Sequence, residues 1–495
     1  MRHAPQIVQG SASPVASAAV DIARSRVGWF GTGLTARVMA RVMARVMALS
    51  LVAMVLFWSG PLAAQQRGLQ LIRDAEIENT IRIYATPLFQ AAGLSPGAID
   101  VYLIADDSLN AFVTQGGRMF LHTGFLMASE TPLQTIGVIA HETGHLAAGH
   151  YIGRRDEIES AGFTAAASSL LAILAGIATG DGRVAAAVSS GGQDIALRNL
   201  LSFTRGQEQA ADQAAVDYLR GTNQSPEGLL DFFRILQNQE VLLSAQQDPY
   251  LRTHPLTADR ITFLEQAVAS SPYTGAPIPA DVMERHQRMR AKLAGFLRTP
   301  REVYHLFPRD DDSLPARYAH AITSFKQGFL DDALVTLDGL IAERPDDPYF
   351  HELRGQMLLE NQRVAEALPE YEKAVELRPR DPQLLLRLAQ VQVELGVEET
   401  FRAALENLTS VLAFEPNNAT AWRLSAIAHG RLGNQGMTAL SLAEYNYARS
   451  NWRDASGQAE KAKTLLEEGT SGWLRASDLA VVAGREAEQE RERER

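Results

Sequence analysis

Residues Val138–Leu146 read VIAHETGHL, and this stretch decides how the first half of the chain folds. Thr131 and Pro132 come shortly before it, and a threonine followed by proline at the first helical position is a typical helix start. Apolar residues then recur from Leu133 to Leu146. The sequence therefore predicts one helix that carries the HETGH segment in its second half.

Two histidines of this helix are spaced as metal ligands. At 3.6 residues per turn, His141 and His145 lie one turn apart on the same face, which two ligands of a single ion require. Glu142 follows the first histidine, so its carboxylate can hold a water molecule beside the ion instead of binding the ion. A catalytic site also needs a third protein ligand and one open coordination position.

The best candidate for the third ligand lies downstream, in a predicted helix that ends at Gly221. Glu208 and Asp212 are four residues apart on this helix and share a face. Glu208 can therefore bind the metal while Asp212 reaches a ring N–H of a ligating histidine and fixes its tautomer. The alternative is a surface helix with two solvated carboxylates, which is a common arrangement.

Several segments together resemble the HtpX and CAAX-prenyl-protease-like zinc metallopeptidases, often called family 48. These segments are His141–His145, Arg205–Asp212, Asn110–Phe112, Gly116–Leu121, Gly124–Leu126, and Thr253–Leu256 with Arg260. The resemblance spans residues 70–265, and one departure is Thr204, where many members carry serine. The combination is much more specific than the HETGH motif alone.

The resemblance implies both the ligands and the catalytic base. It implies one Zn²⁺ per chain, bound by His141, His145 and Glu208. It also implies that Glu142 is the catalytic base and that Asp212 contacts a ligating histidine without binding the metal itself. Two imidazoles and one carboxylate suit zinc, although cobalt and manganese are not excluded.

Three further histidines differ in how near the metal we expect them. On a regular helix His150, nine residues past the first motif histidine, lies half a turn away and should face elsewhere. His122 falls in the predicted strand Arg118–His122, where an ordinary packed or exposed side chain is expected. His254 precedes a proline, in a short loop before a helix that Thr257 can cap. His254 could close the open coordination position, hydrogen-bond the oxyanion during turnover, or only pack; the family resemblance favours a role at the site.

Composition excludes several classes of function. The 495-residue chain is long enough for two or three domains, and its 46% hydrophobic and 21% charged content is ordinary for a folded soluble protein. It has no cysteine, which excludes disulfides, thiol catalysis and thiolate metal sites. Residues 1–64 hold six arginines and one aspartate, so the remainder carries 41 basic against 57 acidic side chains, a net charge of −16. Nucleic acid is therefore not an expected partner.

The N-terminus has the pattern of a secretory signal peptide. Arginines at 37, 41 and 45 precede the apolar run Ala48–Trp58, and small residues then lead to Gln65. This pattern predicts cleavage after Ala64, so residues 1–64 would be a signal peptide or leader. The alternative is an uncleaved anchor, for which the apolar run is short.

The sequence predicts a small sheet ahead of the HETGH helix. Leu71–Leu88 reads as an opening helix, and Asp100–Ile104 as a short strand. Gly116–Gly117 then turns the chain into a second strand, Arg118–Leu121. A strand edge near the metal could pair with an extended peptide substrate; the alternative is a purely structural sheet.

An alanine-rich apolar run, Ala161–Gly180, and a weaker one, Val184–Leu197, separate the second and third expected ligands. The first run is long enough to span a membrane, but Ala, Ser and Gly contribute little transfer free energy. We expect a helical hairpin that packs on the protease core or rests against a membrane surface, so residues 161–197 are a candidate for peripheral membrane contact. A spanning helix, and with it a membrane-embedded protease, is the alternative.

The second half of the sequence is repetitive. An alanine, two apolar residues and a proline recur at fixed offsets, with the prolines 34 and 37 residues apart. The units are Ala333–Pro345, Ala367–Pro379 and Ala404–Pro416, and a more divergent unit begins at Trp422. This period, with alanine at the helix crossing and proline ending the second helix, resembles tetratricopeptide repeats. Such repeats present a concave surface for peptides or partner proteins; the alternative is an ordinary helical domain without a ligand.

The predicted fold class is mainly α. An α+β zincin-like metalloprotease domain with a small sheet occupies residues 65–300, and an α-solenoid of tetratricopeptide repeats occupies residues 312–470. Residues 484–495 are almost entirely Glu and Arg and form either a fraying helix or a disordered tail.

The combination of signal peptide, protease domain and repeats resembles the periplasmic BepA-type branch of family 48. That resemblance implies a zinc-dependent endopeptidase of the cell envelope that degrades misfolded or misassembled outer-membrane proteins. The repeats would recruit clients or the outer-membrane assembly machinery. The alternative is a non-proteolytic chaperone or binding module with a latent zinc site.

Overall fold

The computed structural model describes residues 70–150, 204–237 and 249–493. The expected signal peptide at residues 1–64 and the apolar runs at 161–180 and 184–197 lie outside the described residues. Within the described ranges, none of the helices combines the length and the apolar character needed to cross a bilayer.

A four-stranded sheet, in the order β1-β2-β4-β3, forms one layer of the N-terminal half. Its strands are β1 (Leu71–Ile72), β2 (Asp100–Ile104), β3 (Ala111–Thr114) and β4 (Arg118–His122). β2 and β4 are parallel, whereas the edge strands β1 and β3 run antiparallel to their neighbours. β2 and β4 match the two predicted strands. The sequence does not predict β3, because its four residues are all buried and show no alternation of apolar and polar side chains.

The first long helix begins later than the sequence predicts. Leu71 and Ile72 do not open a helix; they pair with Ile104 and Leu103 as β1. α2 spans Ala75–Ala91, and the side chain of Asp74 accepts a hydrogen bond from the N–H of Ile77 at its start. An aspartate N-cap fixes where a helix begins. The pairing of β1 with β2 is a long-range contact that helical periodicity cannot reveal.

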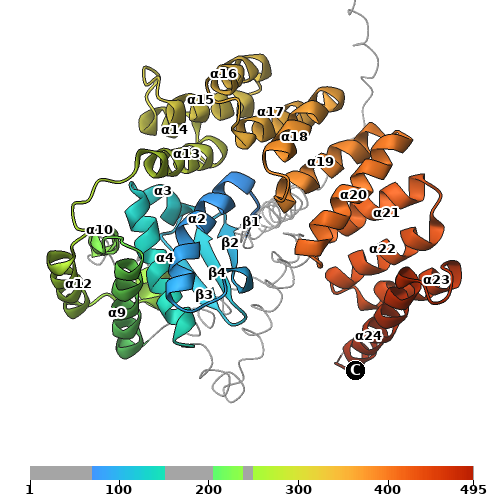
Figure 1. The fold of residues 1–495 in the computed structure, drawn as a ribbon, viewed down its shortest axis with the longest axis horizontal. Helices are drawn as coiled ribbons and strands as arrows, with labels where there is room; N and C mark the ends of the chain where they lie inside the picture. Colours follow the sequence, from blue (N-terminus) through green and yellow to red (C-terminus); the bar gives the residue numbers. More distant parts are fainter. Residues whose placement is uncertain (1–69, 151–203, 238–248, 494–495) are drawn as a thin grey trace, which may run out of the picture. The chain divides into compact units, whose positions relative to one another are not determined.

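α4 (Pro132–Ala147) is the helix predicted from the HETGH stretch. The N–H of Thr131 donates to the side chain of Gln134 over 3.1 Å, which satisfies a backbone group at the helix start. α4 packs against α2, β3, α9 (Arg205–Gly221) and α10 (Glu227–Gln237), as Figure 1 shows. The other helices of this half are η1 (Pro96–Ala98), α3 (Thr123–Ala128), α11 (Pro249–Thr253) and α12 (Ala258–Ser270). Buried apolar side chains of these helices and of one part of the sheet form one core, whereas Ile104, Phe112 and Phe120 of the sheet form a separate cluster.

α13 (Ala280–Leu297) joins the two halves, and α14 (Pro300–Leu306) follows it. Met289 and Leu293 of α13 belong to the core around α4, whereas Ala291 and Ala294 belong to the core of the first repeats. α13 is therefore shared between two hydrophobic cores.

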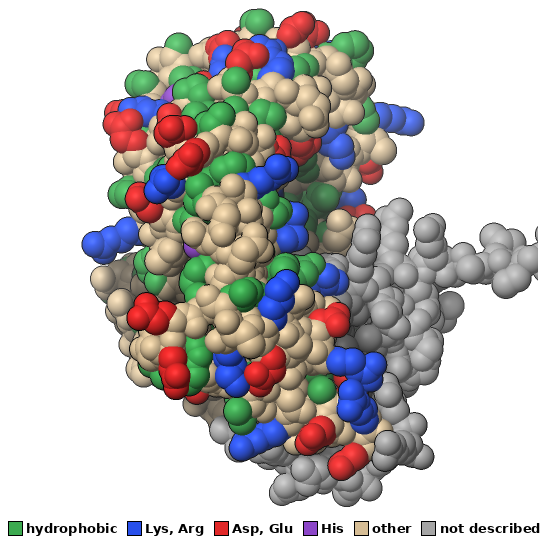
Figure 2. Space-filling model, turned by 90° about the vertical axis from the view of Figure 1, so that its right-hand side faces the viewer, with side chains coloured by type: hydrophobic (Ala, Val, Ile, Leu, Met, Phe, Trp, Pro, Cys, Tyr) green, Lys and Arg blue, Asp and Glu red, His purple; other side chains and the backbone are tan. Residues whose placement is uncertain are grey.

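The C-terminal half consists of paired helices, as predicted for the repeats. They are α15 (Leu314–Lys326), α16 (Leu330–Glu343), α17 (Pro348–Glu360), α18 (Val364–Leu377), α19 (Pro382–Leu395), α20 (Glu398–Phe414), α21 (Ala419–Arg431), α22 (Gln435–Ala448), α23 (Trp452–Leu465) and α24 (Ser471–Arg493). The repeat alanines are fully buried where helices meet (Ala333, Ala367 and Ala404), and α16, α18 and α20 each stop just before a repeat proline. The charged tail continues α24 as a helix as far as Arg493. Acidic and basic side chains are intermixed on the face shown in Figure 2.

Candidate metal centre

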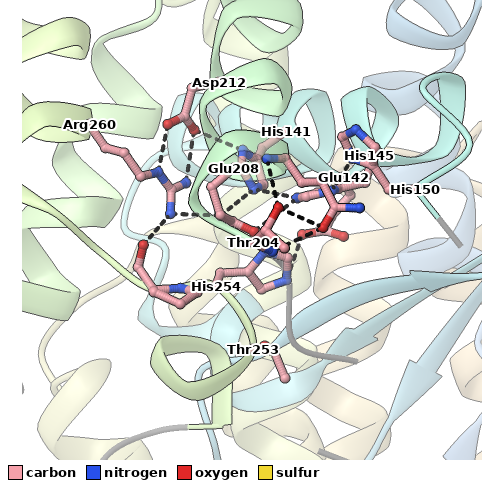
Figure 3. A network of polar contacts seen from close by, with 12 residues as sticks. His141, Glu142, His145, His150, Thr204, Glu208, Asp212, Thr253, His254 and Arg260 are labelled. Atoms are coloured by element: carbon pink, nitrogen blue, oxygen red, sulfur yellow. Dashed lines mark hydrogen bonds and ion pairs between the residues drawn. The ribbon is translucent and has the colours of Figure 1, made fainter. Parts of the chain in front are cut away.

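α4 and α9 lie side by side and bring the five predicted site residues into one buried cluster. His141, Glu142 and His145 of α4 are fully buried, and so are Glu208 and Asp212 of α9 to within 1% of their surface. Figure 3 shows these side chains converging from the two helices. An isolated surface helix with solvated carboxylates is therefore wrong for α9.

The distances within the cluster suit a single metal ion. The Nε2 atoms of His141 and His145 are 3.1 Å apart. The carboxylate oxygens of Glu208 lie 3.5 Å from Nε2 of His141 and 3.3 Å from Nε2 of His145. Two atoms bound tetrahedrally to zinc at ~2.05 Å are about 3.3 Å from each other. The three side chains are therefore spaced as ligands of one ion would be.

The protonation states of the cluster also fit a metal. Nδ1 of His141 lies 2.9 Å from a carboxylate oxygen of Asp212, so a proton is held on this nitrogen and Nε2 is the atom left to bind a metal ion. Neither oxygen of Glu142 accepts a hydrogen bond from the residues that the structure describes, although both are buried. A buried carboxylate with unused acceptors beside two imidazoles suits a residue that binds water next to an ion.

Burial and charge separate the roles of the two glutamates. Burial tends to raise the pKa of Glu208, but His254 and hydrogen bonds with His141 and His145 outweigh burial and hold that pKa far below its ordinary value. Burial raises the pKa of Glu142 to about 7, against an ordinary 4.5. A carboxylate that stays ionised suits a metal ligand, whereas one whose pKa is near neutral suits a base that exchanges protons. A bound cation would lower the pKa of Glu142 toward its ordinary value.

The pKa values of the two motif histidines are shifted in opposite directions. Burial tends to lower the pKa of His141, but its contacts with Asp212 and Glu208 outweigh burial and raise it to about 9. Burial holds the pKa of His145 well below its ordinary value. The negative charge on α9 therefore favours a cation at this point, whether a proton or a metal ion.

His254 lies inside the cluster. It directly follows α11, and its ring stacks on Tyr250 with centroids 4.3 Å apart. Nδ1 of His254 lies 3.1 Å from Glu208, and Nε2 lies 3.5 Å from Glu142. One ligand-capable atom from each of His141, His145, Glu208 and His254 falls within 4.8 Å of the others. His254 is therefore part of the cluster, and a role at the site stays the prediction for it.

His150 lies nearer the site than the sequence predicts. α4 ends at Ala147, and Gly149 adopts a left-handed backbone with φ of 63°, so the chain turns back on itself. Nδ1 of His150 thereby comes within 2.9 Å of Nδ1 of His145, on the side of the ring away from the cluster centre. His150 is thus not among the ligand atoms of the cluster, as expected, but it contacts His145 because the regular helix on which the expectation rests stops too early. Gly149, just past the helix end, was the available signal.

His122 has no place in the cluster. It is buried in β4, where its ring lies 2.8 Å from the hydroxyl of Ser108 and 3.4 Å from Asp106. The prediction of an ordinary packed side chain is confirmed. The sequence places Arg260 in the family motif but does not reveal it as a site residue, because its pairing with Asp212, 48 residues earlier, is visible only in the fold.

Comparisons with known proteins agree with this site. Residues 72–268 match the model of Peptidase family M48, and residues 318–382 match that of the Tetratricopeptide repeat. The Beta-barrel assembly-enhancing protease of Yersinia pestis is 25% identical over 418 residues, which cover 81% of this chain and 80% of that protein. The protein of the same name from Escherichia coli K12 is 24% identical over 411 residues, with 81% and 80% covered. A solved structure, MamA MSR-1 C2, covers 35% of this chain and 89% of its own at 20% identity and a TM-score of 0.26, which carries no argument.

The fold, the cluster and these matches support a metalloprotease with a repeat domain. The chain has a Peptidase family M48 domain followed by tetratricopeptide repeats. It is homologous to the beta-barrel assembly-enhancing proteases over most of its length.

Proposed function

We propose that the chain is a zinc-dependent endopeptidase of the bacterial cell envelope, exported to the periplasm by a cleaved signal peptide at residues 1–64. The observation that carries the catalytic part is the gathering of His141, His145 and Glu208 around one point, with Glu142 buried beside them. Two imidazoles and one carboxylate suit zinc, one ion per chain. The arginine-rich, apolar leader supports export.

The residues of the chain divide the chemistry among them. A bound zinc ion would polarise the scissile carbonyl and the attacking water. Glu142 accepts a proton from that water on one carboxylate oxygen and delivers it to the nitrogen of the leaving amine. The carboxylate of Asp212, 2.9 Å from Nδ1 of His141, would hold the proton on that nitrogen and thereby keep Nε2 of the ring directed at the ion.

The proposed substrates are misfolded or misassembled outer-membrane proteins. Two observations support this: the relatives are named beta-barrel assembly-enhancing proteases, and the repeats supply stacked helix pairs of a kind that binds proteins. The repeats would recruit clients or the outer-membrane assembly machinery. Periplasmic location is tested by release of the protein from cells on osmotic shock, and its retention in the spheroplast fraction would contradict it.

A second function, a non-proteolytic chaperone with a latent zinc site, is favoured by one observation. His254 lies among the ligand atoms, so a ring nitrogen can fill the position that a substrate carbonyl needs. A protein held in this state would keep its metal and bind clients without cleaving them.

Metal content and cleavage of an unfolded protein, measured on residues 65–495, separate the two functions. For the protease, wild type and Glu142→Gln should each hold one zinc. Glu142→Gln should cleave at least about 100-fold more slowly, because the base is lost. His141→Ala should lose both metal and cleavage. Zinc without cleavage in wild type would favour the latent site. Absence of metal from wild type would refute the proposal that His141, His145 and Glu208 bind a metal ion.

A further inference from the structure

Arg260 of α12 is almost fully buried, with 2% of its surface exposed, and its guanidinium contacts three partners. Nε and Nη2 donate to the two carboxylate oxygens of Asp212 over 2.6 and 2.9 Å. Nη1 lies 2.7 Å from Glu208 and donates to the carbonyl oxygen of Pro255 over 2.9 Å. Figure 3 shows these contacts of Arg260 on one side of the cluster.

Each partner of Arg260 belongs to a different part of the site. Asp212 supports His141, Glu208 is a proposed ligand, and Pro255 is bonded through its backbone to His254. The same nitrogen, Nη1, touches both Glu208 and Pro255. One guanidinium thus joins the α9 carboxylates to the loop that carries His254.

The geometry requires an arginine. A guanidinium is planar and donates in several fixed directions at once, so it can hold both oxygens of Asp212 and still reach two further acceptors. The ring of Phe233 lies 4.6 Å from the guanidinium carbon and covers one face of it. A lysine would keep the positive charge, but its single ammonium cannot reach all four acceptors.

We infer that Arg260 is a positioning residue that holds the loop carrying His254 next to Glu208. Access of His254 to the metal position therefore depends on Arg260. This inference rests on the proposed metal centre. It adds a part that the ligand set alone does not contain: the 254–255 loop is fastened to the carboxylates of α9. Arg260→Lys should therefore loosen His254 while leaving the charge of the cluster unchanged.

The first test uses metal affinity in the full mature chain, with Co²⁺ as the probe and a chelator as competitor. Arg260→Lys should weaken Co²⁺ binding by about 10–100-fold, the range for residues that support ligands. In the Arg260→Lys background, His254→Ala should add less than about threefold, because the ring is already displaced. If the two substitutions instead multiply, Arg260 acts independently of His254 and the inference is overturned.

The second test needs no metal. Diethyl pyrocarbonate modifies accessible imidazoles, and mass spectrometry of the peptide containing His254 gives its rate in metal-free protein. Arg260→Lys should raise this rate several-fold, whereas an unchanged rate would overturn the inference. The matched control is Arg234→Lys, an exposed arginine of α10 that pairs with Asp231 and Glu265.

A paired variant guards against misfolding. Truncating one member of a buried ion pair strands the other, whereas removing both charges together is tolerated. Asp212→Asn with Arg260→Met should therefore fold and still expose His254 to modification, whereas Asp212→Asn alone should leave it protected. If wild type binds no Co²⁺, the metal centre fails, and the modification rate still decides whether Arg260 positions His254.

Discussion

Gly144 of α4 lies directly against the backbone of Ala211 on α9: a Cβ added to Gly144 would meet the carbonyl oxygen of Ala211 at 2.9 Å. Gly144 lies between the two motif residues Glu142 and His145. The close approach of α4 and α9 is therefore what brings Glu208 within reach of the histidines. The glycine of the HETGH segment serves the metal centre by its lack of a side chain.

Gly144→Ala should accordingly weaken metal binding as well as the fold. The added methyl group forces α9 away from α4, and overpacking of this kind costs about 1–3 kcal/mol. Displacement of Glu208 should lower zinc affinity, measured by chelator competition, by at least about tenfold. Gly206→Ala on α9, where a Cβ meets nothing within 4 Å, is the control and should leave zinc affinity unchanged. Equal zinc affinities in the two variants would contradict the role of the close approach.

The parts of the site that the sequence predicts are those set by local geometry. His141 and His145 share a face because they are four residues apart on one helix, and the same spacing links Glu208 to Asp212. The contact of His150 with His145 depends on the left-handed turn at Gly149, which follows the end of α4 and which a regular helix does not predict.

Long-range contacts account for most of what the sequence does not predict. β1 pairs with a strand some thirty residues later, and β3 lies buried without an alternating pattern. Arg260 reaches Asp212 across 48 residues. The repeats are predicted well because each helix pair packs mainly on its neighbours, so the pattern of alanine and proline repeats with the structure.

His254→Ala should raise the rate of cleavage at saturating zinc. The ring now lies among the ligand atoms, and its removal frees the position that a substrate carbonyl would occupy. The other role considered for His254, a hydrogen bond to the developing oxyanion, predicts the opposite: a loss of about 100-fold or more. Initial rates on an unfolded substrate decide between them, and a fall in rate would refute closure by His254.

Lys292→Met should strongly destabilise the chain. Lys292 of α13 has 1% of its surface exposed, and its ammonium lies 2.9 Å from Asp74, 3.2 Å from Glu352 and 3.4 Å from Glu76. Its removal leaves buried carboxylates without their cation, which costs about 3–5 kcal/mol of the free energy of unfolding. Urea unfolding monitored by circular dichroism measures this.

Two further variants test the cause of that loss. Adding Glu352→Gln to Lys292→Met should recover part of the stability, because one stranded carboxylate is neutralised. Lys373→Met, which breaks an exposed pair with Glu376, should cost no more than about 1 kcal/mol. If Lys292→Met costs as little as Lys373→Met, the buried cluster contributes nothing to stability.

His286 of α13 should make stability depend on pH in the acid range. It is buried, and its Nε2 donates to the carbonyl oxygen of Ser129 over 2.6 Å. Burial lowers the pKa of His286 to about 4 from an ordinary 6.5, so between these values the unfolded chain binds a proton that the folded chain does not. The free energy of unfolding should therefore fall as the pH drops from 6.5 toward 4, by up to about 3 kcal/mol. His286→Gln keeps an N–H donor near Ser129 but cannot titrate, so urea unfolding at several pH values should show a flatter profile. If wild type and His286→Gln lose stability equally over this range, a group other than His286 takes up the proton.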